Sequence, residues 1–306
     1  MNININEFAS LVSSKIPGTE VAEIFKDNDV KYVGIRNKMS GGGITPLVYI
    51  NQCYEDYMKH GDIVVDEAVK YVKEQLEAHA VNADKAGVNT LTDWNLAKNQ
   101  VICRVRKYST SKEYLKGKVF RKMSDLAVTY HVLVPELSNG PSYQAAAPVT
   151  KGLFESWKRE HEDLTEEELD RVATSNLSEL TPMSIMSMSN VLRRCSLKKG
   201  ADREMFLRTA EEAEEIPMYV ISNDDFVQGA AAMVNTSIMD EVSSLIGDFY
   251  IIPSSVHELI VVPKDIDKDY INALVKDVNK SLNPEEVLSD HLYEYNSKTR
   301  KVKSAR

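Results

Sequence analysis

The sequence predicts an α+β protein in two parts, with mixed helices and mostly antiparallel sheets. Three observations lead to this fold class. Short β-rich runs bounded by turn residues occur in both halves of the chain. Segments with apolar residues at helical spacing lie between those runs. The C-terminal part follows the order β-β-α-β-β-α-β.

We expect four segments along the chain. Residues 1–150 form an N-terminal α+β part, and residues 151–217 form a helical connecting region. Residues 218–297 form a C-terminal α+β part, and residues 298–306 form a basic, flexible tail. The tail has five basic residues in nine, which is typical of a solvated, frayed terminus.

The N-terminal part is predicted to begin with a helix and a hairpin. Apolar residues recur at helical spacing before Pro17-Gly18, and they are Ile5, Phe8, Leu11, Val12 and Ile16. The β-rich runs Val21–Phe25 and Val30–Ile35 follow. Between them, Asp27-Asn28-Asp29 has the residue types of a turn, so the two runs predict a hairpin.

Further strands and one helix complete the first part. A strand is expected over Ile44–Ile50, where Pro46 favours an edge position. The helix that follows has one buried face, formed by Val65, Val69, Val72 and Leu76. More strands are expected at Val101–Val105, Leu126–Val134 and Tyr143–Ala147.

The clearest signal in the helical connecting region is a helix start at Leu164–Leu169. Thr165 can accept a hydrogen bond from the amide of Glu168, and Glu168 can reach back to the amide of Thr165. The helix is expected to end near Leu180, because Thr181-Pro182 disfavours helical backbone. A second helix is predicted to carry Ile185, Met188, Leu192 and Cys195.

The C-terminal part is predicted to contain short strands and two helices. The strands are Met218–Ile221, Gly229–Val234, Asp248–Ile252, Leu259–Val262 and Leu292–Tyr295. The first helix contains Ile238, Met239, Val242, Leu245 and Ile246 and ends at Gly247, and the second covers Tyr270–Leu282. Leu259–Val262 is apolar at every position, which predicts a central strand covered on both faces.

Composition and charge restrict the class of protein. The 306 residues are 43% hydrophobic and 27% charged, as expected for a soluble, globular chain. The formal net charge of −9 repels nucleic acid and anionic membranes unless a local patch is present. Neither an export signal nor a membrane span is found, which predicts a cytoplasmic protein. The three cysteines lack a Cys-x-x-Cys pair and are predicted to be free thiols: Cys53, Cys103 and Cys195.

No complete metal, cofactor or phosphate motif is found. Gly41-Gly42-Gly43 lacks the Gly-Lys-Ser/Thr of a phosphate loop and precedes a predicted strand, so we expect a turn there. The six histidines form no zinc-binding pair, and they are His60, His79, His131, His161, His257 and His291. We therefore expect no metal and no cofactor, while a ligand set assembled from distant residues stays open.

One loop, Pro253–Glu258, carries the residue types that catalysis uses. The candidate catalytic residues are two hydroxyls, an imidazole and a carboxylate: Ser254, Ser255, His257 and Glu258. In an extended chain Ser255 and His257 share one side while Glu258 lies on the other, so a relay would need a broken strand. We favour a structural interpretation, in which the loop forms a turn and its polar groups satisfy nearby backbone.

Five stretches of the chain are typical of one protein family. They are Gly34-Ile35-Arg36; Ile44–Asn51 with Tyr54–Tyr57; Met218–Val220 with Gly229–Ala231; Phe249–Glu258; and Val287–Asp290 with Tyr293 and Tyr295. Through them nearly the whole chain resembles domain-of-unknown-function family 5688, a group of proteins from anaerobic gut bacteria. The resemblance implies a bacterial intracellular protein and supplies no activity, ligand or catalytic residue.

The sequence therefore favours a binding or accessory protein, because good core patterning occurs without a local catalytic signature. The alternative is a small-molecule or peptide hydrolase that uses the Pro253–Glu258 loop. A third hypothesis, nucleic-acid binding through the basic tail, is disfavoured by the acidic net charge. The partner stays open, with a protein as one candidate and no membrane expected.

Overall fold

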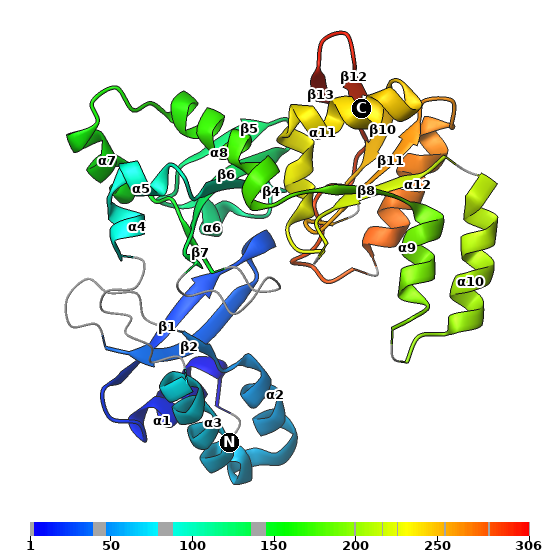
Figure 1. Ribbon diagram of the computed structural model, residues 1–306. Coiled ribbons are helices and arrows are strands. Elements are labelled where there is room, and N and C mark those ends of the chain that lie inside the picture. The colour runs from blue at the N-terminus through cyan, green and yellow to red at the C-terminus, as the bar shows by residue number, and fades with distance from the viewer. Residues whose placement is uncertain are drawn as a thin grey trace.

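Three antiparallel sheets and the helices around them make up the structure, a computed structural model (Figure 1). The structure describes residues 3–38, 47–78, 88–135, 145–198, 200–215, 217–224, 226–253, 255–280 and 282–305. Within these residues, twelve α-helices and thirteen strands are present. The predicted α+β class is therefore confirmed. None of the helices in this part of the chain is long and apolar enough to cross a lipid bilayer.

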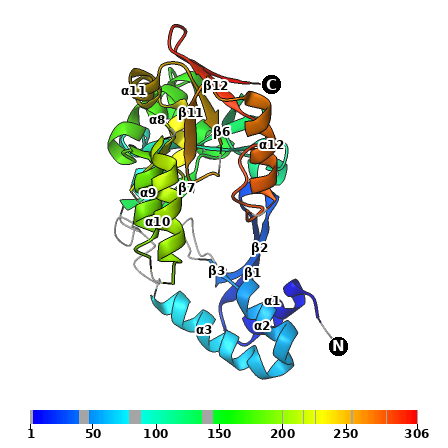
Figure 2. The ribbon, with the colours of Figure 1, turned by 90° about the vertical axis from the view of Figure 1, so that its right-hand side faces the viewer.

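The N-terminal module, residues 3–38 and 47–78, has a sheet and a core of its own. Its strands, in the order β1-β2-β3, are β1 (Thr19–Phe25), β2 (Lys31–Asn37) and β3 (Val48–Tyr49). Its helices are α1 (Ile5–Ser14), α2 (Asn51–His60) and α3 (Val65–Ala78). Its buried hydrophobic cluster includes Phe8, Val33, Ile35 and Val72. Figure 2 shows the β1–β2 hairpin rising from these helices toward the rest of the chain.

Three predictions are confirmed in this module: the first helix, the hairpin, and the buried face of the helix that follows the third strand. Asn4 caps α1 through a reciprocal bond pattern with Glu7. β1 and β2 pair around a short 3₁₀ turn, Asp27–Asp29. The predicted buried face of α3 is buried at every position: Val65, Val69, Val72 and Leu76. Of the strand expected over Ile44–Ile50, β3 is present, while the preceding glycines and Ile44 to Pro46 lie outside the described residues.

The second sheet has four strands with β6 (Leu126–Leu133) at its centre. β6 pairs with β4 (Val101–Lys107) along one side, and with β5 (Phe120–Met123) and β7 (Ala146–Pro148) along the other. The strands expected near Val101 and Leu126 are confirmed, while β5 was not predicted. For the strand expected over Tyr143–Ala147, β7 begins at Ala146, and Tyr143 lies outside the described residues.

Helices surround this four-stranded sheet. α8 (Glu166–Leu180) packs against β4 and begins where predicted, because Thr165 accepts a hydrogen bond from the amide of Glu168 at 3.1 Å. The Glu168 carboxylate binds Arg171, and among the described contacts it forms no bond to the amide of Thr165, so only half of the predicted reciprocal cap is present. The shorter helices are α4 (Val88–Thr92), α5 (Trp94–Ala97), α6 (Lys112–Leu115) and α7 (Lys151–Glu160).

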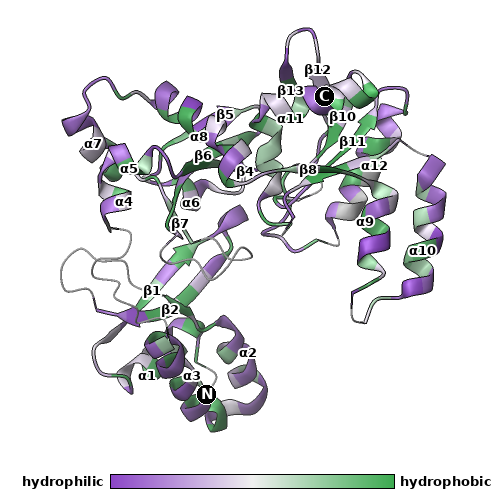
Figure 3. Ribbon diagram, in the orientation of Figure 1, coloured by the Kyte–Doolittle hydropathy of each residue, from purple (hydrophilic) through white to green (hydrophobic). Residues whose placement is uncertain are grey.

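The third sheet has six strands in the order β13-β12-β10-β11-β9-β8. These are β8 (Ser184–Ser187), β9 (Tyr219–Ser222), β10 (Phe249–Ile252), β11 (Leu259–Pro263), β12 (Tyr293–Asn296) and β13 (Lys301–Ser304). The prediction of a central, doubly covered strand is confirmed for β11, which is hydrophobic along its length (Figure 3). Leu259 and Val261 belong to the main core, and Val262 packs on the opposite face with Ile271 and Val275.

Four helices accompany the six-stranded sheet. They are α9 (Met188–Cys195), α10 (Arg203–Glu212), α11 (Thr236–Ile246) and α12 (Lys268–Asn279). α11 ends at Gly247, as predicted, where φ is 75° and a side chain would be strained. α9 and α10 lie side by side and project from the sheet (Figure 1).

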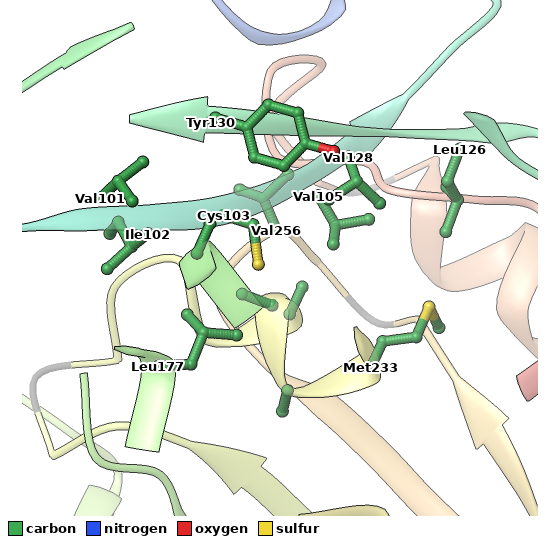
Figure 4. Packing of buried hydrophobic residues seen from close by; sticks show 14 of the residues in the cluster. Val101, Ile102, Cys103, Val105, Leu126, Val128, Tyr130, Leu177, Met233 and Val256 are labelled. Atoms are coloured by element: carbon green, nitrogen blue, oxygen red, sulfur yellow. The ribbon is translucent and has the colours of Figure 1, made fainter. Parts of the chain in front are cut away.

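One main core joins the four-stranded and six-stranded sheets. Figure 4 shows residues of β4, β6 and α8 packed together with Met233 and Val256, which come from the C-terminal part. The same cluster includes Ile221 and Ile251 of the six-stranded sheet. The expected boundary at residue 150 therefore does not separate two cores, because residues on both sides of it belong to the same cluster. The expected connecting region 151–217 is likewise shared, because α8 packs on one sheet and β8 is a strand of the other.

The predicted C-terminal order is wrong at one element. Gly229–Val234, predicted as a strand, is a buried 3₁₀ turn. It consists mainly of glycine and alanines, which are apolar but have little preference for strands. The observed order after β9 is this turn, α11, β10, β11, α12, β12 and β13.

Two further expectations are corrected. Ile185, expected in a helix, lies in β8 opposite Ile221, so the second predicted helix starts only at Met188. The tail, expected to be frayed, forms β13, which pairs with β12 from Lys301 to Ser304. Its lysines alternate with Val302, a strand pattern that the high charge concealed.

Candidate functional site

The Pro253–Glu258 loop lies between β10 and β11 and is built into the core. Ser255 is buried, with 3% of its surface exposed, and Val256 belongs to the main core (Figure 4). Ser254 lies outside the described residues. The predicted turn is present, because the amide of Ser255 faces the carbonyl oxygen of Glu258 at 3.4 Å.

The three described candidates form two separate hydrogen-bond groups. Ser255 Oγ donates to Glu258 Oε1 at 2.9 Å and accepts from the amide of His257 at 2.9 Å. The His257 ring instead accepts, through Nδ1, from the amide of Gln228 at 3.3 Å. The turn thus brings Ser255 to Glu258, whereas the extended-chain expectation paired Ser255 with His257. No hydrogen bond between Ser255 and the imidazole occurs among the described contacts.

The backbone of this loop is also fixed from outside. The carbonyl oxygen of His257 accepts from Ser222 Oγ at 2.7 Å and from the amide of Gly229 at 2.9 Å. A Cβ at Gly229 would collide with the carbonyl oxygen of His257 and with Ser222 Oγ, so only glycine allows this close approach. The amide of Val256 donates to the carbonyl oxygen of Glu286 at 2.9 Å. These bonds give the loop the geometry of a packed junction between segments.

A different group of polar side chains lies on the second face of the four-stranded sheet. Successive side chains of a strand alternate in direction, and Cys103 and Val105 belong to the main core. Arg104 and Arg106 therefore project from the opposite face, where α6 lies (Figure 1). We call this the cationic face, and its basic residues are Arg104, Arg106, Lys112, Lys118 and Lys122.

Arg106 is the buried centre of the cationic face, with 2% of its surface exposed. Its guanidinium forms an ion pair with Asp27 of the N-terminal module, and its Nε donates to Thr129 Oγ1 at 3.3 Å. The ring of Tyr114 lies 3.7 Å from the guanidinium carbon and 4.0 Å from Lys118 Nζ. Burial, followed by the charge of Arg106, lowers the pKa of Lys118. Two cations therefore share one aromatic ring.

His131 lies beside these cations and is 3% exposed. Its Nε2 is 3.2 Å from Thr129 Oγ1, and its Nδ1 has no hydrogen-bond partner among the described residues. Burial lowers the pKa of His131 well below its usual value, and the neighbouring Arg104 and Arg106 lower it further. The imidazole is therefore neutral at pH 7 and adds no charge to the cationic face.

The outer part of the cationic face is a second cluster of cations around a tyrosine. Lys112 Nζ lies 3.1 Å and Lys122 Nζ 4.0 Å from the ring centre of Tyr108. Hydrogen bonds, first from Lys112 and then from Lys122, lower the pKa of Tyr108. Both lysines are exposed. Phe120 lies beside Tyr108, with ring centres 6.0 Å apart. This part of the surface combines accessible positive charge with aromatic rings.

The Asp27–Asp29 turn is seated on the cationic face. Besides the ion pair of Asp27, the carboxylate of Asp29 accepts from the amides of Glu113 and Tyr114 at 3.0 and 2.8 Å. Asn28 donates to the carbonyl oxygens of Pro284 and Val287, at 2.5 and 2.7 Å. The N-terminal module therefore docks on the rest of the chain through an acidic segment.

Sequence reasoning missed the cationic face, although a signal exists. Residues 104–122 contain eight Lys or Arg and a single acidic residue, in a chain with a net charge of −9. Arg104 and Arg106 also alternate with apolar residues, which places them on one face of a strand. The partners Asp27 and Tyr114 come from other segments, which the sequence does not place.

In the parts of the chain that the structure describes, no group of three or more metal-ligating side chains is found. This search leaves out His79, which lies outside those parts. The three cysteines are free. Burial raises the pKa of Cys103 to about 12, so its thiol is protonated and inert at pH 7.

Comparisons with known proteins point to one family. The profile of a family of unknown function, DUF5688, matches residues 6–297, which cover all three sheets except β13. No curated protein matches the chain. No solved structure matches it. With the match extending over nearly all of its length, the chain belongs to the family of unknown function DUF5688.

Proposed function

We propose that this chain is a binding protein whose cationic face takes an acidic segment of a protein partner. One observation carries the proposal, which is that the face already holds an acidic segment of the same chain. Asp27 pairs with Arg106, and Asp29 accepts from two amides of α6. The same chemistry can receive carboxylates of a second protein.

Positive charge remains for such a partner beyond the Asp27–Asp29 turn. Lys112 and Lys122 are exposed at the outer end of the cationic face, and Lys118 is partly exposed. Lys112 and Lys122 lie over the ring of Tyr108 and bind its hydroxyl, and Lys118 lies over the ring of Tyr114 and donates to its carbonyl oxygen. Cations held over aromatic rings keep hydrogen-bond donors for carboxylates, and the rings offer apolar contact area. An extended acidic segment therefore fits this surface.

The hydrolase alternative receives no support from the contacts of the Pro253–Glu258 loop. A serine nucleophile needs a base within hydrogen-bond reach. Ser255 donates to Glu258, and the ring of His257 binds the amide of Gln228. Both of these described side chains are therefore already engaged, Ser255 within the turn and His257 with Gln228. We therefore retain the binding function and treat this loop as part of the scaffold.

Fluorescence anisotropy tests the proposal with a labelled peptide of about ten residues that repeats Asp-Asn-Asp-Gly. The comparison ligands are the same peptide with Asn at every Asp, and a single-stranded oligonucleotide of about ten bases. We expect the acidic peptide to bind at least about tenfold more tightly than its neutral analogue at low salt. The affinity should fall as salt rises, because exposed charges are screened.

Charge reversal on the cationic face gives the decisive variant. Lys112→Glu with Lys122→Glu should weaken peptide binding at least about fivefold. The matched control is Lys59→Glu with Lys73→Glu, an equal change of net charge at exposed positions of α2 and α3, which should leave the affinity unchanged. Equal binding of the neutral peptide, or equal loss in both double variants, contradicts the proposal. Preferential binding of the oligonucleotide would replace it with a nucleic-acid function.

A further inference from the structure

A pocket of about 250 Å³ lies where the four-stranded and six-stranded sheets meet. Its walls come from β5, from α11 with the preceding 3₁₀ turn, and from the β12–β13 hairpin, which lie together in Figure 1. The tail strand β13 contributes directly, through Lys301 and Val302. At about 30 Å³ for each water-sized group, the pocket holds on the order of eight non-hydrogen atoms.

Each sheet supplies one anchored arginine to this pocket. Arg121 of β5 donates from Nε to Asp170 of α8 at 2.7 Å, and Tyr130 donates to the same carboxylate oxygen at 3.0 Å. Arg300 binds Asp240 of α11, which also accepts from the hydroxyl of Tyr295. In both sets a helix aspartate holds an arginine and a strand tyrosine; Arg121 lies in β5, and Arg300 lies in the turn between β12 and β13.

Both arginines keep donors for a ligand. A guanidinium has five N–H groups; Arg121 binds Asp170 through Nε, and Arg300 binds Asp240 through one terminal nitrogen and also interacts with Tyr295. Lys301, which is exposed, adds a third cation to the lining. Against these three cations stand Asp170 and Asp240, so the mouth of the pocket has a net positive charge. Because the aspartates fix the arginines, little side-chain freedom is lost when an anion binds.

The floor of the pocket is apolar and adaptable. Three methionines from three different segments line it, together with valines. The methionines are Met123, Met233 and Met239. Met233 and Met239 are buried in the main core. Methionine side chains are flexible and polarisable, so they fit apolar ligands of varied shape.

We propose that this pocket binds a small apolar acid, with its carboxylate at Arg121, Arg300 and Lys301 and its hydrocarbon part on the methionine floor. The volume suits an acid of about six carbons. The proposal is independent of the cationic face, because the two sites share no residue. It also gives the tail strand a binding role in addition to its pairing with β12.

Methionine-methyl NMR of the full chain tests this site with hexanoate as the probe. The spectrum has eleven methionines, and replacing Met123, Met233 and Met239 one at a time with Leu identifies their signals. We expect hexanoate to shift these three signals in a saturable way and to leave the others in place. Hexanol lacks the charge, acetate lacks the chain and hexylammonium has the opposite charge, so each should bind at least about fivefold more weakly.

The charge requirement is tested on the tail strand. Lys301→Glu should weaken hexanoate binding at least about fivefold, whereas Lys303→Glu, the same change two residues later and outside the lining, should not. The same spectra report whether each variant is folded. Absence of saturable shifts at the three methionines, hexanol binding as tightly as hexanoate, or equal effects of the two lysine variants would overturn the proposal.

Discussion

The Asp27–Asp29 turn and the Pro253–Glu258 loop each connect two antiparallel strands and each carry polar side chains, yet their hydrogen bonds lead in different directions. In the loop, the described polar side chains bind within the loop or to the backbone of Gln228, which packs against it. In the turn, the three side chains reach three other segments, at Arg106, at α6 and at residues 284–287.

This comparison separates residue type from tertiary role. The loop has the residues of a catalytic site, but a serine, a histidine and a glutamate also satisfy backbone groups in a tight turn. The turn has residues that any hairpin could use, and its function depends on what lies opposite. Polar residues become a junction only when another part of the fold supplies complementary partners, and a local pattern does not contain that information.

The largest effect is expected from the turn. Asp27→Ala leaves the guanidinium of Arg106 buried without its carboxylate, which should cost about 3–5 kcal/mol of unfolding free energy. Replacing both partners, as Asp27→Ala with Arg106→Met, should recover a large part of that loss. Urea unfolding measures both values, with Asp265→Ala, at an exposed position, as the control. If Asp27→Ala lowered the free energy of unfolding no more than the control does, the Asp27–Arg106 ion pair would not stabilise the docking of the turn.

Asn28 distinguishes side-chain bonds from backbone strain in the same turn. Its φ of 55° lies in the left-handed region, and its amide binds two carbonyl oxygens. Asn28→Ala loses the bonds and strains the backbone, so about 2–3 kcal/mol is expected. Asn28→Gly loses only the bonds and should cost about 1–2 kcal/mol. Denaturant titration should rank the two variants in this order, and the reverse ranking would mean that the left-handed backbone of Asn28 adds no strain to the alanine variant.

Ser255 tests the loop as a piece of scaffold. Ser255→Ala removes the acceptor of the His257 amide and the donor to Glu258 in a buried position, so about 1–3 kcal/mol of stability should be lost. Ser244→Ala on the exposed side of α11 is the control and should change stability little. Thermal melting followed by circular dichroism is sufficient. An unchanged melting curve for Ser255→Ala would return the loop to the list of catalytic candidates.

His131, which lies beside the cations of the cationic face, should make the stability of the protein depend on pH. Its pKa is lowered in the folded state, so below about pH 6.5 the unfolded chain takes up a proton that the folded chain does not. Stability should fall as the pH drops, by about 1 kcal/mol between pH 6.5 and 5.5. Urea unfolding at several pH values measures this slope. His131→Asn should remove that part of the slope, and an unchanged slope would show that His131 is accessible to protons.

His257 should give the smallest effect. Its ring makes a single bond of 3.3 Å to the amide of Gln228, while its carbonyl and amide bonds survive truncation. His257→Ala should therefore cost about 1 kcal/mol, or about 2–4 °C in the melting temperature if a domain of ordinary size unfolds as a unit. Scanning calorimetry detects such a shift. A larger loss than that of Ser255→Ala would mean that the ring, and not the serine, fixes the loop.

Elements with a clear period were predictable, and elements defined by their partners were not. The spacing of Val65, Val69, Val72 and Leu76 gave α3, and the unbroken apolar run of β11 gave its central place, because burial on a known face leaves a period in the sequence. Gly229–Val234 is equally apolar, but its shape follows from the backbone of His257 packed against it. The cationic face could not be predicted in the same way, because it is formed by contacts between segments more than 70 residues apart in the sequence.

The pairing of β13 with β12 has a consequence for how the chain behaves as a population of molecules. β13 is the outer strand of the six-stranded sheet, and two of its four residues are lysines. Charged edge strands discourage other chains from adding to a sheet. Proteolytic loss of the tail would expose β12, with its tyrosines, as an open edge. Trimming these few residues would then favour aggregation, and an intact tail preserves the dispersed state.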